Sequence, residues 1–202
     1  MLKRWVAGAV AACAMLLFPL PAQAAGPASV AKKLFHAWLS ADKAAAAKVA
    51  TPAAVKTIFA YPYRAPDVFA GCAGNACRFK HTSVTVPGDL DGILMIVSGS
   101  KVAKVYESRH LTKPGKAALW LFGAWKAGDR NRGLEVASAK AVSTIFRARF
   151  DPHGVPYTYQ GCTAEPHGWA CQWSYEGGAM TMHVRGSKTA GYAVRSVTYI
   201  AD

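Results

Sequence analysis

Acidic residues are scarce in this chain of 202 residues, which has 11 aspartates and glutamates against 24 lysines and arginines. Few carboxylates are therefore present to act as general acids or bases. Common enzyme motifs are also absent, since there is no G-x-S-x-G, no phosphate loop, no H-E-x-x-H and no C-x-x-C. These absences favour a protein that is not an enzyme, with no catalytic residue, no cofactor and no bound metal.

Long apolar runs are equally rare, and the one that stands out covers residues 5–20. Lys3 and Arg4 precede it, and Ala22-Gln23-Ala24 follows it as a small-x-small site. This order is typical of an export signal that is cleaved near residue 24. Two alternatives remain open, namely lipidation at Cys13 within Val10-Ala11-Ala12-Cys13 and an uncleaved anchor. We expect a secreted or envelope-associated protein without a stable membrane span in its mature form.

Removal of residues 1–24 leaves 22 basic residues against 11 acidic ones, and four of the five cysteines. An even cysteine count in an exported chain predicts two disulfides. The basic excess favours an acidic protein or an anionic envelope polymer as partner, although it also serves solubility. The basic residues are scattered along the chain, and we do not expect specific nucleic-acid binding.

An internal repeat organises the rest of the sequence. Residues 31–60 align without a gap on residues 118–147, an offset of 87, and 13 of the 30 positions are identical. The short strings AVKTIF and AVSTIF, which begin at Ala54 and Ala141, belong to this alignment. Gly71-Cys72 recurs as Gly161-Cys162, with a second cysteine after each. We therefore expect repeat unit 1 over residues 25–112 and repeat unit 2 over residues 113–202.

Each unit changes its hydrophobic period once. Apolar residues such as Leu34 and Trp38 have helical spacing. Asp42 and Asp129 are expected to cap second helices, and Thr51-Pro52 to open a third. Short runs of β-type residues follow. The sequence predicts an α+β fold of two tandem repeats, each a helical lead followed by an antiparallel meander sheet.

The cysteines are expected to pair within each unit, Cys72 with Cys77 and Cys162 with Cys171, so that each disulfide joins two neighbouring strands. Zinc is the alternative ligand for these thiols. It is disfavoured because the cysteine spacing differs between the units and an exported chain meets an oxidising compartment.

One hairpin carries the candidate ligand-binding residues. With Gly177-Gly178 as its turn, Tyr175 faces Met180 and Trp173 faces Met182. Alternation then places the apolar residues on one face and the polar residues on the other. The polar face is the predicted ligand-binding set: Gln172, Ser174, Glu176, Thr181, His183 and Arg185. The alternative for this face is the ordinary wet side of an antiparallel sheet.

Basic residues that are specific to the second unit form a second candidate binding surface. Arg130, Arg132 and the Arg147–Arg149 pair, with Lys126 and Lys140, are candidates for an anion-binding surface or for solvated helix faces. Trp120 aligns with Lys33, which suggests a surface aromatic residue or a contact between the units.

Two resemblances follow from these motifs. The pattern AW-x-x-x-D, A-V-x-T-[IL]-F and Gly-Cys…Cys, here over residues 31–77 and 118–171, resembles uncharacterised exported proteins of high-GC Gram-positive bacteria. The architecture of two helix-plus-sheet units with one disulfide each is loosely similar to the β-lactamase inhibitory protein family. That family's G-M-T-x-x-Q-V motif is absent here, so inhibition of a lactamase is not implied.

The expected function is that of an exported, non-enzymatic binding protein. Its partner is expected to be an acidic macromolecule or envelope component in the groove between the repeats. The alternative is a small-molecule binder, with or without enzymatic activity, that is similar to the NTF2-like proteins and has His183 or Asp151 in a cavity. A deep apolar pocket with a His/Asp pair would favour that alternative.

Overall fold

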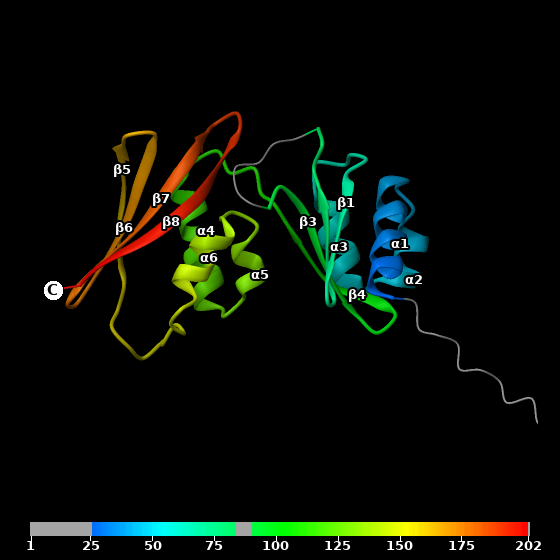
Figure 1. Ribbon diagram of the computed structural model, residues 1–202, viewed down its shortest axis with the longest axis horizontal. Coiled ribbons are helices and arrows are strands. Elements are labelled where there is room, and N and C mark those ends of the chain that lie inside the picture. The colour runs from blue at the N-terminus through cyan, green and yellow to red at the C-terminus, as the bar shows by residue number, and fades with distance from the viewer. Residues whose placement is uncertain (1–25, 84–89, 202) are drawn as a thin grey trace, which may run out of the picture.

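The computed structural model describes residues 26–83 and 90–201. The expected signal peptide, residues 1–24, lies outside this part of the chain. Within the described residues the fold is α+β, in two halves that each have three helices followed by four strands (Figure 1). The first half contains α1 (Pro27–Leu39), α2 (Lys43–Val49), α3 (Pro52–Ala60), β1 (Val68–Ala73), β2 (Ala76–Lys80), β3 (Gly92–Ser98) and β4 (Lys101–Glu107). The second half contains α4 (Pro114–Lys126), α5 (Arg130–Gly133), α6 (Ala139–Ile145), β5 (Thr158–Glu165), β6 (Gly168–Tyr175), β7 (Gly178–Ser187) and β8 (Gly191–Ala201).

The short helices begin at side-chain caps, and the sequence predicts those at Asp42 and Asp129. Asp42 accepts a hydrogen bond from the backbone N–H of Ala45, and Asp129 accepts one from Arg132. Thr51 and its counterpart Ser138 cap α3 and α6 in the same way. Each cap satisfies an N–H group that the first helical turn leaves without a partner. The predicted capping role of both aspartates is confirmed.

Each half forms one four-stranded antiparallel sheet in sequence order. The disulfides Cys72–Cys77 and Cys162–Cys171 join the first two strands of each sheet, as predicted. One face of each sheet packs on helices of its own half, which are α1, α2 and α3 for the first sheet and α4 and α6 for the second. We call the other face of each sheet its open face.

The two cores are built alike on the helix-covered faces. Trp38 is fully buried in the first half and Trp125 is 4% exposed in the second. Phe35 stacks on Phe79 with ring centroids 4.1 Å apart, and Phe122 stacks on Trp173 at 5.0 Å. Large aromatic rings contribute much of the burial that stabilises a small domain.

The predicted register of the β6–β7 hairpin is wrong by two residues. Tyr175 pairs with Gly178, and Trp173 pairs with Met180 rather than with Met182. A slip of two residues keeps every side chain on its face, because side chains alternate with a period of two. The predicted faces therefore hold, and the apolar set packs on the helices.

The reason for this register lies in the two glycines. Gly177 takes a positive φ of 79° and completes the turn. Gly178 is a strand residue that pairs with Ala201, and a Cβ on it would lie 2.3 Å from the carbonyl oxygen of Ile200. Gly178 is therefore required by its close approach to β8 and lies outside the turn.

The second half packs against the open face of the first sheet. Leu94 and Tyr106 lie on this face and are buried. Helix α5 contacts β4, and the Tyr106 hydroxyl donates to Oδ2 of Asp129 at 3.1 Å. The cap of α5 thus also joins the two halves.

Arg109, in the connector after β4, completes this junction. Its Nη2 lies 3.0 Å from Oε1 of Glu107, and its Nε donates to Oε2 of Glu135 at 3.0 Å. Its guanidinium also lies over the Trp120 ring, 4.3 Å from the centroid. Trp120 therefore contacts the connector between the halves. Burial raises the pKa of Glu107 to about 7, against the opposing effect of Arg109.

A buried polar chain fixes the start of the connector to the first half. His81 Nδ1 lies 2.5 Å from Oδ2 of Asp67, and both side chains are fully buried. His81 Nε2 lies 2.5 Å from the Tyr61 hydroxyl, which donates to the carbonyl oxygen of Ser108 at 2.8 Å. The single Tyr61 proton goes to this carbonyl, so Nε2 of His81 must be the donor to Tyr61. Burial raises the pKa of Asp67, and the His81 charge opposes this shift.

Among the helices in the described part of the chain, none is long and apolar enough to cross a bilayer.

Replacing His81 with leucine should destabilise the first half, because Asp67 would be buried without its partner. We expect a loss of about 3–5 kcal/mol in the free energy of unfolding, measured by denaturant titration. The double variant Asp67→Val with His81→Leu should lose less, since no charge is left buried. Equal losses in the two variants would contradict this account of the pair.

Glu107→Gln should remove part of the pH dependence of stability. The folded protein holds a proton on Glu107 up to about pH 7, whereas an unfolded glutamate titrates near about pH 4.3. The folded state therefore binds more protons in this window, and stability falls as pH rises through it, by about 2 kcal/mol. Unfolding titrations at about pH 5 and 8 should show a smaller difference for Glu107→Gln than for the wild-type protein.

Candidate functional site

The open face of the second sheet gathers most of the predicted ligand-binding residues. Gln172 and Ser174 lie on it from β6, and Thr181, His183 and Arg185 lie on it from β7, as their alternation with buried neighbours requires. Glu176 lies in the turn between β6 and β7, at the end of the sheet. The face looks away from the helices of its own half.

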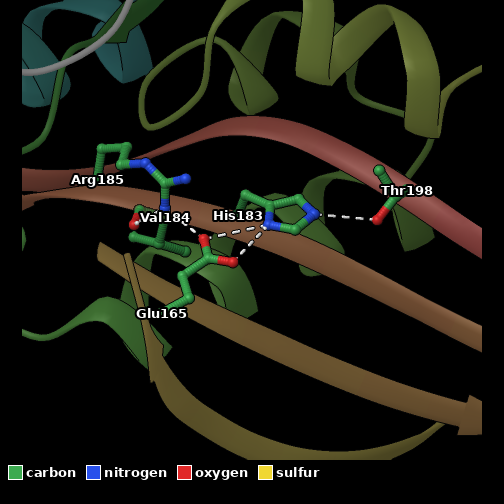
Figure 2. Close-up of polar contacts among 5 residues, drawn as sticks. All are labelled: Glu165, His183, Val184, Arg185 and Thr198. Atoms are coloured by element: carbon green, nitrogen blue, oxygen red, sulfur yellow. Dashed lines mark hydrogen bonds and ion pairs between the residues drawn. The ribbon is translucent and has the colours of Figure 1, made fainter. Parts of the chain in front are cut away.

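A polar chain crosses this face from β5 to β8. His183 Nδ1 lies 3.0 Å from Oε2 of Glu165, and His183 Nε2 lies 3.0 Å from the Thr198 hydroxyl (Figure 2). Arg185 donates from Nη1 to Oε1 of Glu165. Figure 2 shows the His183 ring between Glu165 and Thr198, with Arg185 directed at the same carboxylate.

Gly168 makes this chain possible. It pairs with Glu165 on the neighbouring strand, and a Cβ on Gly168 would lie 2.7 Å from Nη1 of Arg185. The missing side chain leaves room for the guanidinium to reach across β6 to the carboxylate. The same Cβ would lie 2.2 Å from the carbonyl oxygen of Val184, so the backbone also requires glycine here.

The electrostatics of the chain favour an ionised Glu165. Partial burial raises its pKa, but hydrogen bonds from Arg185 and His183 outweigh burial, and the pKa falls below its ordinary value. In nucleophilic catalysis a hydroxyl is activated by an imidazole whose other nitrogen contacts a carboxylate, and Thr198, His183 and Glu165 have this order. Here the hydroxyl lies exposed on a sheet face, and the hollows described below are lined by other residues.

Sequence reasoning missed Glu165 and Thr198. They lie 18 and 15 residues from His183, on strands that flank its own hairpin. No local motif joins them to His183. Only their outward-facing positions on β5 and β8 indicate that they could reach His183, and this inference requires knowledge of the strand register.

In the described part of the chain, two hollows are each lined by three cationic side chains. The first-half hollow, of about 640 Å³, has an apolar floor that includes Val55 and Phe59. Lys43, Lys56 and Lys101 surround it, and the described residues that line it include no carboxylate. Lys43 Nζ lies 5.7 Å from the centroid of the Phe59 ring.

The second-half hollow, of about 810 Å³, lies beyond the ends of α4 and α6. Lys126, Arg147 and Arg149 meet there, and no carboxylate is among its described lining residues. Phe146 and Phe150 contribute aromatic rings, and Lys126 Nζ lies 5.6 Å from the Phe150 centroid. The structure thus brings together Lys126 and the Arg147–Arg149 pair, whereas Arg132 lies over Trp120 at the junction.

The space between the halves is largely filled. A hollow of only about 10 Å³ remains between α5 and the first sheet, bordered by Glu107 and Glu135. A larger one, the junction hollow of about 570 Å³, lies beside α3 and the connector. Its lining includes Lys56, Tyr63 and His110, and also Glu107 and Arg109, which pair with each other.

Neither a metal-binding cluster nor a similar known protein indicates a role for these sites. Within residues 26–83 and 90–201, no group of three or more His, Cys, Asp or Glu side chains is placed to hold a metal ion. No protein-family model, no curated protein and no solved structure matches the chain.

Glu165→Gln should weaken the polar chain in a pH-dependent way. Because the pKa of Glu165 is lowered on folding, its stabilising effect is present above about pH 4.3 and is lost as pH falls. The groups are partly exposed, so we expect a loss of only about 0.2–1 kcal/mol at pH 7. Thermal unfolding of both proteins at pH 7 and pH 3 tests this, and an undiminished difference at pH 3 would contradict it.

Proposed function

We propose that this chain is an exported, non-enzymatic protein that binds an acidic macromolecule through the cationic hollows of its two halves. One observation carries the proposal. Each half has a hollow in which three cationic side chains lie beside aromatic surface, one ring (Phe59) in the first half and several in the second, while no carboxylate is among the described lining residues. Like charges that gather without counter-charges raise the local potential and attract anions.

The two hollows differ in the anionic groups that suit them. Arg147 and Arg149 offer planar guanidinium groups, which form paired hydrogen bonds with carboxylates or phosphates. Lys43, Lys56 and Lys101 offer point charges around an apolar floor. A partner with both acidic and apolar side chains suits this combination better than a purely ionic polymer does.

The groove between the halves is a poor place for such a partner. Glu107 and Glu135 border it, and the remaining space of about 10 Å³ holds no ligand group larger than water. The proposal therefore places the acidic partner on the helical faces and at the edge of the junction. Approach should be fast and salt-sensitive, because the chain without residues 1–24 has 22 basic residues against 11 acidic ones, a net charge of +11.

Duplication of one ancestral unit is part of this proposal. The offset of 87 residues places Phe59 on Phe146, and each of these rings lines the cationic hollow of its own half. The matching caps and disulfides support the same origin. Two related binding surfaces on one chain would increase avidity for a long partner.

The alternative function, small-molecule binding with acid–base chemistry, has less support. The buried His81–Asp67 pair lies in the core and lines none of the four hollows described above. The Glu165–His183–Thr198 chain lies on an open sheet face. Neither site encloses a ligand, so binding at the cationic hollows is the function that the geometry supports best.

Charge reversal in the hollows should weaken partner binding. We expect the triple variants Lys43→Glu, Lys56→Glu, Lys101→Glu and Lys126→Glu, Arg147→Glu, Arg149→Glu each to bind at least about tenfold more weakly. The matched control carries Lys116→Glu, Lys140→Glu and Lys188→Glu, which change the net charge equally at exposed sites outside the hollows. Binding of fluorescent poly-glutamate is measured at about 50 and 300 mM salt, where screening differs strongly.

The same variants then serve as baits for envelope and culture-supernatant fractions. A protein or polymer retained by the wild type and by the control, but by neither hollow variant, is the partner that the proposal describes. Equal loss of binding in all three variants would show that net charge alone is responsible, and would overturn the proposal.

A further inference from the structure

Helix α3 separates two of the hollows described above. The first-half hollow lies on one side of it and the junction hollow lies on the other. Lys56 and Ala60 line both hollows, and both residues are exposed. They are four positions apart, so they lie one turn apart on the same face of the helix. We call this pair the α3 ridge.

The α3 ridge consists of one charged residue and one small residue. Lys56 offers an ammonium group that is exposed and without an ion pair among the described residues. Ala60 is small, so a crossing chain can approach the helix there without displacing a side chain. In the second half the alignment places Ser143 and Arg147 at these positions, so the ridge is specific to the first half.

Apolar surface lies on both sides of the α3 ridge. Val55 and Phe59 are half-buried in the first-half hollow. Tyr63 and Leu111 are half-buried in the junction hollow. Half-buried apolar side chains at the edge of a hollow gain from contact with an apolar group that enters it.

We infer that the partner presents a linear acidic segment that crosses α3, with one carboxylate over Lys56 and one apolar side chain in each flanking hollow. This rests on the proposed function and names the recognition element for the first half. A helix with its side chains is about 10–12 Å wide. In an extended chain, side chains at i, i+2 and i+4 share one face, and i to i+4 spans about 13 Å. The segment therefore has the form apolar-x-acidic-x-apolar.

Synthetic peptides test the order of these three residues. The parent peptide has leucine, glutamate and phenylalanine at alternate positions, separated by serine and labelled with a fluorophore. One comparison peptide has serine at both apolar positions, a second has glutamine for glutamate, and a third has the two apolar residues adjacent. At about 50 mM salt we expect the parent to bind roughly tenfold more tightly than each comparison peptide.

The Ala60→Trp variant tests whether the parent peptide binds across the α3 ridge. The bulky ring at this exposed position should block the crossing chain and abolish the advantage of the parent peptide. Lys56→Gln should remove the preference for glutamate over glutamine and leave the preference for the apolar residues. Ala190→Trp, at an exposed turn position of the second half, is the matched control and should keep both preferences. Thermal unfolding of each variant confirms that it is folded.

The outcomes separate this inference from the proposed function. If the parent and the serine peptide bind equally, and binding is lost in the Lys43, Lys56 and Lys101 charge-reversal variant, the inference is wrong while the proposed function stands. If no acidic peptide binds and poly-glutamate does not distinguish the hollow variants from the control, both are wrong.

Discussion

The guanidinium of Arg109 joins the two halves of this protein. Glu107 comes from the end of the first sheet and Glu135 from the segment after α5, and both carboxylates are almost completely buried. Two such groups repel each other unless a cation lies between them. Arg109 contacts both and lies over Trp120, so one side chain reduces the repulsion between the two carboxyl groups and packs against the second half. The packing of α5 against the first sheet depends on this arrangement, and so does the Tyr106–Asp129 hydrogen bond.

Much of the fold follows from local sequence because its determinants are local. The caps at Asp42 and Asp129, the half-by-half disulfides and the faces of the β6–β7 hairpin all depend on residues within a few positions of one another. The hairpin register does not. Gly177 and Gly178 are equally suited to a turn, and only the approach of β8 to Gly178 decides between them. The junction is likewise tertiary, since nothing near Arg109 in sequence indicates Glu135 as its partner.

The candidate sites show the same division. His183 and Arg185 were predicted on one face because they alternate along a single strand, whereas Glu165 and Thr198 reach them from neighbouring strands. Lys126, Arg147 and Arg149 attract notice as additions to the second unit. Lys43, Lys56 and Lys101 come from α2, α3 and β4, and only the fold gathers them around one apolar floor. Predicting such a site requires the packing of three elements, which periodicity does not supply.

The contrast between the two open faces has a consequence for assembly. On the first sheet, the cross-strand pair Leu94 and Tyr106 seats the second half. The pair at the corresponding place on the second sheet is Thr181 and Thr198, beside the charged groups of Glu165 and Arg185. An apolar pair can pack against another element, whereas the ion pair between Glu165 and Arg185 would lose its contact with water if the same kind of surface covered it. The contact that joins the second half to the first sheet therefore has no apolar counterpart at this place on the second sheet.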